Sequence, residues 1–146
     1  MHATCWRSDA LRHTLTPSWS VELPDDGEGS ITDDGELTVA APGRSIVLAT
    51  WDAAPGVDAA DLLETLKASE RPPIREDYTE RGSDGTLRWA VLIDEDDDGA
   101  RYQGLYGYVL AEREWLQVAV LFEHAEDLAE ALHVWRSVRH VQPSEG

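Results

Sequence analysis

From Arg101 to Arg139 the sequence reads RYQGLYGYVLAEREWLQVAVLFEHAEDLAEALHVWRSVR. Residues 101–110 and 115–122 are rich in Tyr, Val, Leu and Trp, which favour β-strands, and the polar segment between them is short enough for a hairpin connection. After Phe122 the spacing of apolar residues changes from about 2 to about 3.6, which indicates a helix from about Ala125 to Arg139. We therefore expect a long hairpin followed by an amphipathic helix.

The register of this hairpin decides which side chains share a face. If Leu110 lies opposite Trp115, alternation along the strands separates an aliphatic face from an aromatic face, and a connection one residue longer or shorter would exchange the partners. The aliphatic face carries Leu105, Val109, Leu116, Val118, Val120 and Phe122. The aromatic face carries Tyr102, Tyr106, Tyr108, Leu110, Trp115, Gln117, Ala119 and Leu121. We expect the helix to cover the aliphatic face through Leu128, Ala131, Leu132, Trp135 and Val138.

The segments before this hairpin read as further strands and one short helix. Strands are expected at 19–23 and 30–32, and hairpins at 36–41 with 45–51 and at 74–81 with 86–94. Asp58 is a suitable N-cap for a short helix that ends near Ser69. Residues 1–15 show no clear period and read as a flexible arm or a short first strand.

The order of these elements predicts an α+β fold. Short connections between neighbouring strands favour antiparallel pairing. We therefore expect one domain over residues 1–146, with an antiparallel sheet of about six to seven strands and helices packed on its faces.

The charge of the chain restricts its partners. It has 29 acidic and 12 basic residues, which gives a formal net charge of −17. Such a chain repels phosphate backbones and anionic membranes, so we expect neither nucleic acid nor a membrane as a partner. Two interpretations of the charge stay open: a strongly solvated surface, or an acidic patch that binds a basic protein.

The sequence also restricts the location. No run of residues approaches the ~18 apolar residues that cross a membrane. Arg7, Asp9 and Arg12 lie where a signal peptide would be apolar. We therefore expect a cytoplasmic protein.

One acidic segment matches part of a calcium loop. Asp94, Asp96 and Asp98 alternate before Gly99, as in the first half of such a loop. The twelfth position is Leu105 instead of a bidentate Glu, and the following residues favour a strand where a helix is needed. We interpret the segment as an acidic hairpin tip that binds a cation weakly at most.

Other motifs with a known chemistry are missing. The five His residues form no His-Glu-x-x-His pair, and Cys5 has no second Cys for a zinc set. The sequence contains no glycine-rich phosphate loop and no nucleophile elbow. We therefore assign no catalytic, cofactor-binding or metal-binding residue, although a Ser, His and acid brought together by folding stay possible.

Three short motifs carry a resemblance to a known fold family. They are Leu23-Pro24-Asp25, the helix that begins near Asp58 after a strand pair, and Ser137-Val138-Arg139 at the end of the last helix. With this layout, most of the chain resembles the PsbP-like and DcrB-like fold family. The chain lacks the export signal and lipid-bearing Cys of the family's bacterial lipoproteins, and has Gly27-Glu28 where a Trp commonly follows the early Pro. The resemblance implies a non-enzymatic binding or accessory role and transfers no catalytic residue.

The function expected from the sequence is binding through protein–protein contacts. The short helix offers few apolar residues, so it should cover part of the aromatic face and leave the rest for a partner protein or a second copy. The alternatives are that loops and this helix complete a second core layer, or that the chain is a small hydrolase-like enzyme. The residues expected on the partner surface are Tyr102, Tyr106, Tyr108 and Trp115.

Overall fold

The structure is a computed structural model that describes residues 12–16, 18–23, 28–31, 36–52, 56, 58–69, 74–82, 84–97 and 99–141. The strands are β1 (Arg12–Thr16), β2 (Trp19–Glu22), β3 (Glu28–Ile31), β4 (Leu37–Ala41), β5 (Arg44–Asp52), β6 (Ile74–Arg81), β7 (Leu87–Asp97), β8 (Ala100–Leu110), β9 (Glu114–Phe122) and β10 (Arg139–His140). The helices are α1 (Ala59–Ser69), the 3-10 turn η1 (Ala125–Asp127) and α2 (Leu128–Ser137).

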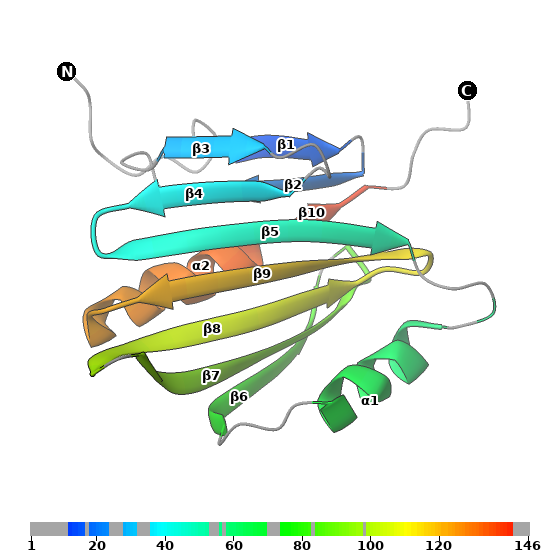
Figure 1. The fold of residues 1–146 in the computed structure, drawn as a ribbon. Helices are drawn as coiled ribbons and strands as arrows, with labels where there is room; N and C mark the ends of the chain where they lie inside the picture. The colour runs from blue at the N-terminus through cyan, green and yellow to red at the C-terminus, as the bar shows by residue number, and fades with distance from the viewer. Residues whose placement is uncertain are drawn as a thin grey trace.

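Antiparallel sheets with two α-helices form the described part of the chain (Figure 1). The larger sheet has seven strands in the order β3-β4-β5-β9-β8-β7-β6, and the smaller sheet has the order β1-β2-β10. The expected antiparallel sheet is therefore confirmed, but the strands form two sheets instead of one. The smaller sheet forms where β2 pairs with β1 and with the last strand, which includes Arg139, a residue that the sequence predicted to be helical. The expected first strand begins at Arg12, and residues 1–11 lie outside the described part.

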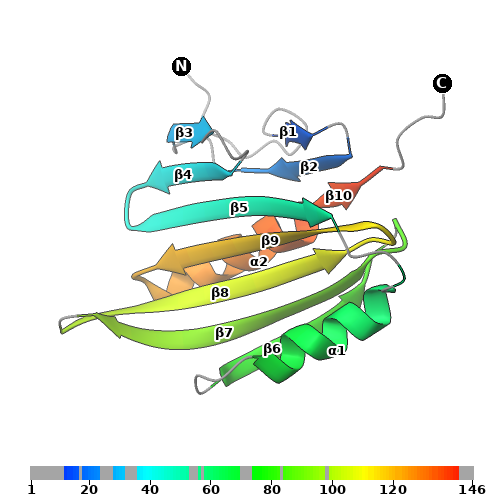
Figure 2. The same cartoon turned by 45° about the vertical axis from the view of Figure 1, so that its right-hand side comes forward.

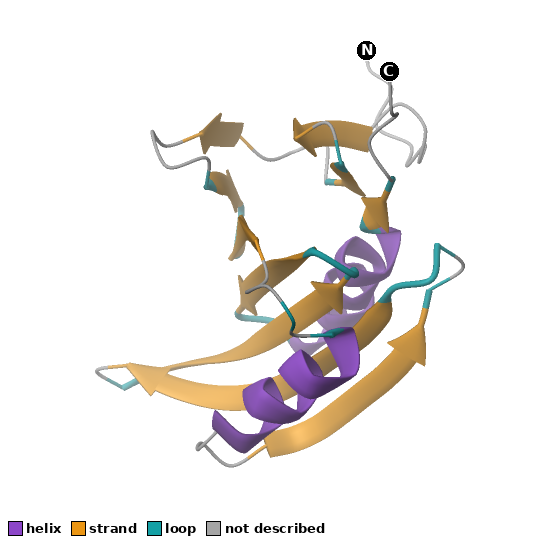
Figure 3. Cartoon of the chain, turned by 90° about the vertical axis from the view of Figure 1, so that its right-hand side faces the viewer, coloured by secondary structure: helices purple, strands orange, loops and turns teal. Residues whose placement is uncertain are grey.

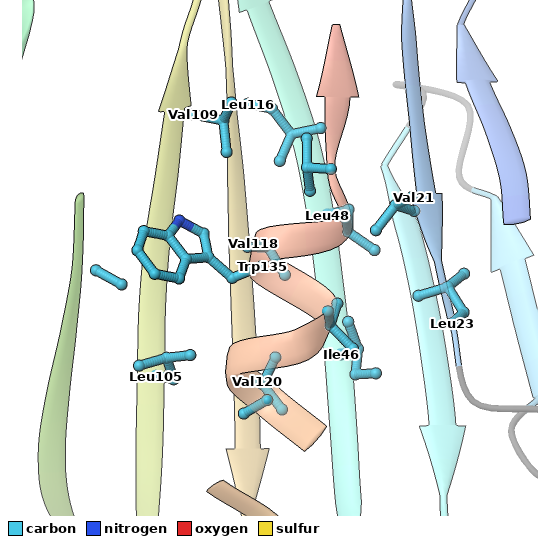
Figure 4. Close-up of a cluster of buried hydrophobic side chains, with 14 of the residues drawn as sticks. Val21, Leu23, Ile46, Leu48, Leu105, Val109, Leu116, Val118, Val120 and Trp135 are labelled. Atoms are coloured by element: carbon cyan, nitrogen blue, oxygen red, sulfur yellow. The ribbon is translucent and has the colours of Figure 1, made fainter. Parts of the chain in front are cut away.

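The predicted register of the β8–β9 hairpin is confirmed. Leu110 lies opposite Trp115, and Leu105 lies opposite Val120. All six residues of the aliphatic face are buried, and they share one core with side chains from β2, β4 and β5 (Figure 4). The alternation of the two strands thus decides which side of the main sheet becomes the principal core.

The helix α2 covers this aliphatic side. Its Trp135 is fully buried, and the indole lies so close to Gly107 that an added Cβ atom would be 2.4 Å from Trp135 Cδ1. Glycine at position 107 therefore makes room for the largest side chain of the core. Val134 is also fully buried, whereas Leu128 and Leu132 are only partly buried, so the apolar stripe faces the sheet at a different angle than predicted.

The helix ends earlier than predicted because a buried guanidinium binds its last carbonyl groups. Arg88, on β7, donates hydrogen bonds to the carbonyl oxygens of Arg136 (3.0 Å) and Val138 (2.6 Å). Its Nη2 also lies 3.1 Å from Asp84 Oδ2. Carbonyls at the end of a helix lack partners within the helix, so these bonds stabilise its termination at Ser137. The chain then becomes extended at Val138 and enters β10.

The smaller sheet closes one side of the principal core. Trp19 and Val21 of β2 are buried against the same cluster as α2. The amide of Glu22 donates to Ser137 Oγ at 2.9 Å, which ties β2 to the end of α2.

The helix α1 packs on the other side of the main sheet. Its Leu63 is buried against Trp89, Val91 and Tyr108, in a second apolar cluster separate from the principal core. The predicted face of the β6–β7 hairpin, Leu87, Trp89, Val91 and Ile93, belongs to this cluster. In Figure 2 the helix lies alongside the β6–β7 end of the sheet, and Figure 3 shows both helices, in purple, beside the strands of the main sheet.

Candidate functional site

The side of the main sheet opposite α2 is only partly covered. Among the described elements, α1 contacts β7 and β8, and Figure 1 shows no helix or strand in front of β4, β5 and β9. We call this uncovered surface the open face. It consists of the side chains that strand alternation directs to this side of β4, β5, β8 and β9 and that α1 leaves exposed: Thr38, Ala40, Ser45, Val47, Ala49, Trp51, Tyr102, Tyr106, Trp115, Gln117, Ala119 and Leu121.

A row of four aromatic rings crosses the sheet from the covered region to the open face. Trp89 stacks on Tyr108 with ring centroids 5.6 Å apart, and Tyr108 lies 6.3 Å from Trp115. Trp115 stacks on Trp51 at 4.5 Å with 21° between the planes. Exposure rises along the row, from 2% for Trp89 to 42% for Trp51. The row therefore begins inside the layer under α1 and ends in a solvent-accessible indole.

The four residues that the sequence analysis assigned to a partner surface lie on the expected side of the sheet, but they do not form one exposed patch. Tyr108 is 6% exposed and belongs to the packed cluster beneath α1, which corrects its assignment to that surface. Tyr106 and Trp115 are partly buried at the border of that cluster. Tyr102 lies at the other end of β8, beside two surface grooves.

The open face also contains residues that the sequence analysis did not assign to a site. Val47 and Ala49 of β5 lie opposite Ala119 and Gln117 of β9, and Trp51 lies opposite Trp115. These β5 side chains are partly or largely exposed, whereas Ile46 and Leu48, between them, are buried. The signal in the sequence was this alternation, but the sequence did not reveal that β5 pairs with β9.

Tyr106 is held in place by the neighbouring strand β7 and by its own strand β8. Its hydroxyl donates a hydrogen bond to the Glu95 carboxylate on β7. The phenol ring passes over Gly104, where an added Cβ would be 2.7 Å from Tyr106 Cε1. This arrangement fixes the edge of the open face that borders α1.

The grooves at the other end of the sheet have volumes of about 480 Å³ and 570 Å³. Both are lined by Arg101, Tyr102 and Glu123. Both grooves are lined by charges of both signs, with Arg75, Asp94 and Glu95 lining the first groove only and Arg44 the second groove only, so neither offers a charge of a single sign to a small ligand. We therefore do not assign a small-molecule site here.

The acidic tip is built as part of a hairpin. Asp94 accepts hydrogen bonds from Arg75 Nη1 at 2.6 Å and from Gln103 Nε2 at 2.9 Å. The bond from Gln103, together with Arg75, holds the pKa of Asp94 below its ordinary value. Asp98 lies outside the described residues. No group of three or more His, Cys, Asp or Glu side chains within the described ranges is arranged to hold a metal ion.

Folding brings a His, an acid and a Ser together near α2. His133 Nε2 lies 2.8 Å from Glu22 Oε1, and Ser137 lies one turn further along the helix. Ser137 is 8% exposed, and its hydroxyl donates to the Val134 carbonyl at 2.7 Å. A nucleophilic Ser needs its hydroxyl directed at a base and at the substrate. This hydroxyl is directed at the helix backbone instead.

A second His–acid pair lies at the junction of β9 and β10. His140 Nε2 is 2.7 Å from Glu114 Oε2, and the imidazole packs against Trp19 with centroids 4.6 Å apart. The backbone amide of His140 donates to Asp84 at 2.9 Å. These contacts attach the last described strand to the two sheets.

Comparison with known proteins finds a similar fold but no matching family and no function for the site. No protein-family model matches the sequence, and no curated protein matches it either. A protein from Bacteroides thetaiotaomicron has a similar structure, with a TM-score of 0.68 and 10% sequence identity over 88% of this chain. This chain spans about half, 48%, of that protein's length. The likeness is one of fold alone.

A second solved structure covers a larger share of both chains. PA94, a protein of unknown function from Pseudomonas aeruginosa, aligns over 92% of this chain and 97% of its own, with 14% identity and a TM-score of 0.46.

Within the part of the chain that the structure describes, neither helix has the length and apolar character needed to cross a membrane.

Proposed function

We propose that this chain is a non-enzymatic binding or accessory protein that acts through protein–protein contacts, and that the open face is its binding surface. The observation that carries the proposal is the position of Trp51. This indole is 42% exposed, and it is stacked on Trp115 at the end of a row of packed aromatic rings. Large aromatic side chains that are both rigid and exposed are typical of residues that dominate binding energies.

The aliphatic centre of the open face supports the same proposal. Val47, Ala49 and Ala119 present apolar groups beside the two Trp residues, and the described elements leave them partly exposed. Contiguous apolar surface of this kind marks interaction sites in globular proteins more often than isolated exposed residues do. A partner that covers it would remove apolar area from water, which is favourable by about 25 cal/mol per Å².

The arrangement of the titratable groups supports binding over hydrolysis. Ser137, the serine beside the His133–Glu22 pair, is buried and hydrogen-bonded to the backbone. The open face itself carries no His among its members. The hydrolase-like alternative therefore has no specific observation in its favour.

The proposal includes the wider expectations from the sequence. We propose a single α+β domain with helices on both sides of the sheet, similar in layout to the PsbP-like and DcrB-like proteins. We propose a cytoplasmic location, and the net charge of −17 supports a protein that binds neither nucleic acid nor membranes. A second copy of the chain is the competing occupant of the open face.

The experiment compares three forms of the tagged chain as bait in extracts of the source organism. Wild type, Trp51→Ser and Ile74→Ser differ in which exposed apolar side chain is removed. Ile74 is the matched control because it is 41% exposed and lies on the edge strand β6, away from the open face. A captured protein is then identified, purified and titrated against each form by calorimetry.

The proposal predicts a partner that wild type and Ile74→Ser bind equally and that Trp51→Ser binds at least about tenfold more weakly, since a hot-spot Trp contributes at least ~2 kcal/mol. Three results would contradict it. One is that cross-linked extracts yield no protein retained by both wild type and Ile74→Ser. Another is that the partner is equally sensitive to both substitutions. The third is concentration-dependent dimerisation lost in Trp51→Ser, which would assign the open face to a second copy.

A further inference from the structure

The Arg side chains of β5, β7 and β8 lie on the α2 side of the main sheet. Cationic side chains of the central strands point to the side of α2: Arg44 of β5 binds Glu130, and Arg88 of β7 lies beneath the end of the helix. Arg101 of β8 lies two residues before Gln103 and four before Leu105, so strand alternation also places it on the α2 side. These positions are fixed by the strand registers.

The open side of the sheet differs in its cations. From β3 through β4, β5, β9 and β8, alternation directs two charged residues of the described chain to this side, Glu28 and Glu36, and no Lys or Arg. Glu28 lies opposite Ala40, and Glu36 immediately precedes β4. The rim of the open face at β3 and β4 is therefore acidic, next to an aliphatic centre and an aromatic end.

We infer, on the basis of the proposed function, that the occupant of the open face is a positively charged, apolar segment of another protein. Its apolar side chains would cover the centre around Val47 and Ala119, and its Lys or Arg side chains would lie at the acidic rim. Complementary charge favours a basic partner over an acidic one and raises the association rate.

The exposed Trp51 gives a second site for a cation. Lys67 Nζ lies 5.8 Å from the centroid of Trp89, and the Arg136 guanidinium lies at the same distance from Trp135. Both indoles thus already have an internal cation nearby. Trp51 is 42% exposed, so an equivalent cation from another molecule can reach its ring.

The dimensions fit one segment of a partner chain. Three strands, β4, β5 and β9, spaced ~4.8 Å apart form a platform roughly 10–15 Å wide, and the length of β5 makes it about 30 Å long. One helix or one extended segment has this footprint. A second copy of the chain would bring another net charge of −17 to a face toward which the described residues of β4, β5, β8 and β9 direct no Lys or Arg. The charge therefore favours a different protein over self-association.

Two labelled synthetic peptides test this inference by fluorescence polarisation. They share the same Leu and Trp positions, and their polar positions are all Lys and Arg in one peptide and all Glu in the other. The protein forms are wild type, Trp51→Ser, the rim pair Glu28→Gln with Glu36→Gln, and the control pair Glu64→Gln with Glu126→Gln. Both pairs change the net charge equally, and both control residues are exposed and lie off the open face.

The inference predicts that the cationic peptide binds wild type at least about tenfold more tightly than the acidic peptide does, and that its affinity falls with added salt. Trp51→Ser and the rim pair should each weaken it about fivefold or more, whereas the control pair should change it less than about twofold. Thermal melts of each form check that the fold is retained.

Each opposite result has a separate meaning. If the rim and control pairs weaken the cationic peptide equally, the attraction is a property of the whole chain, and the inference is overturned. If both peptides bind equally tightly and both depend on Trp51, the cationic partner is excluded while the proposed binding surface stands. If the cationic peptide binds independently of Trp51, the inference is wrong about the surface.

Discussion

Trp51 and Trp115 lie directly opposite each other on β5 and β9, and their rings stack with centroids 4.5 Å apart. One side of this pair is supported by Tyr108 and Trp89, which are buried under α1. The other side is solvent. The pair therefore joins the second core cluster to the open face and holds an exposed indole in a fixed orientation.

This position predicts unequal effects of two aromatic substitutions on stability. Trp89→Ala removes a buried ring and should lower the free energy of unfolding by ~3–5 kcal/mol. Trp51→Ala removes one stacked but exposed ring and should cost about 0.5–1.5 kcal/mol. Chemical denaturation of both variants measures the two values. Equal losses would show that Trp51 belongs to the core and is unavailable for a partner.

A glycine substitution tests the packing of the principal core. Gly107→Ala places a Cβ atom about 2.4 Å from Trp135 Cδ1, so the indole or the strand must move. We expect a loss of ~1–3 kcal/mol from overpacking. Gly29→Ala on the edge strand β3 is the matched control, because an added Cβ atom there would lie 3.4 Å from the nearest side-chain atom. An unchanged melting midpoint for Gly107→Ala would contradict the contact with Trp135.

Replacing Arg88 should destabilise the junction between β7 and α2. Arg88→Met keeps most of the apolar volume but removes the donors to the Arg136 and Val138 carbonyls and leaves Asp84 without its guanidinium. Because buried groups lose their partners, we expect a loss of ~3–5 kcal/mol by denaturant titration. Arg113→Met, in the exposed β8–β9 turn, is the matched control and should change stability by less than ~0.5 kcal/mol.

The same junction predicts a pH dependence. Burial acts to raise the pKa of Asp84, but hydrogen bonds from His140 and Thr86 and the charge of Arg88 outweigh it, so its pKa lies below the ordinary value of 3.8. A carboxyl group with a depressed pKa in the folded state stabilises the protein above its unfolded-state pKa, and this contribution disappears as the pH falls through the folded pKa. The stability difference between wild type and Asp84→Asn should therefore be full at pH 7 and shrink below about pH 4. A difference independent of pH between 7 and 2 would contradict this account.

The acidic tip should not bind calcium tightly. Asp94 is already engaged by Arg75 and Gln103, and the segment lies between two paired strands, β7 and β8. Isothermal titration should show no saturable binding at micromolar calcium. A micromolar isotherm abolished by Asp96→Ala would make the tip a metal site.

The hairpin and its register could be predicted because both depend on neighbouring residues. The alternation in β8 and β9 and the short connection between Leu110 and Trp115 were enough to separate the two faces correctly. The end of α2 could not be predicted in this way. It is determined by Arg88, whose guanidinium reaches the helix from a strand far away in the sequence.

The candidate site was predictable only in part for the same reason. The aromatic residues of β8 and β9 were visible in the sequence, but Trp51 joins them through the pairing of β5 with β9, which no local pattern reveals. The burial of Tyr108 follows from where α1 docks, and this too is a long-range contact. Periodicity therefore located the face, and tertiary packing determined which of its residues are accessible.

Hydroxyl-radical footprinting of the chain alone and in complex with its purified partner shows whether the open face is the binding surface. Binding at the open face predicts that oxidation of Trp51 and Leu121 decreases severalfold in the complex. Oxidation of Ile74 and Val141, which are 41% and 59% exposed at other positions, should stay the same. Protection of Ile74 or Val141 with Trp51 still fully reactive would place the partner elsewhere and contradict the assignment of the open face.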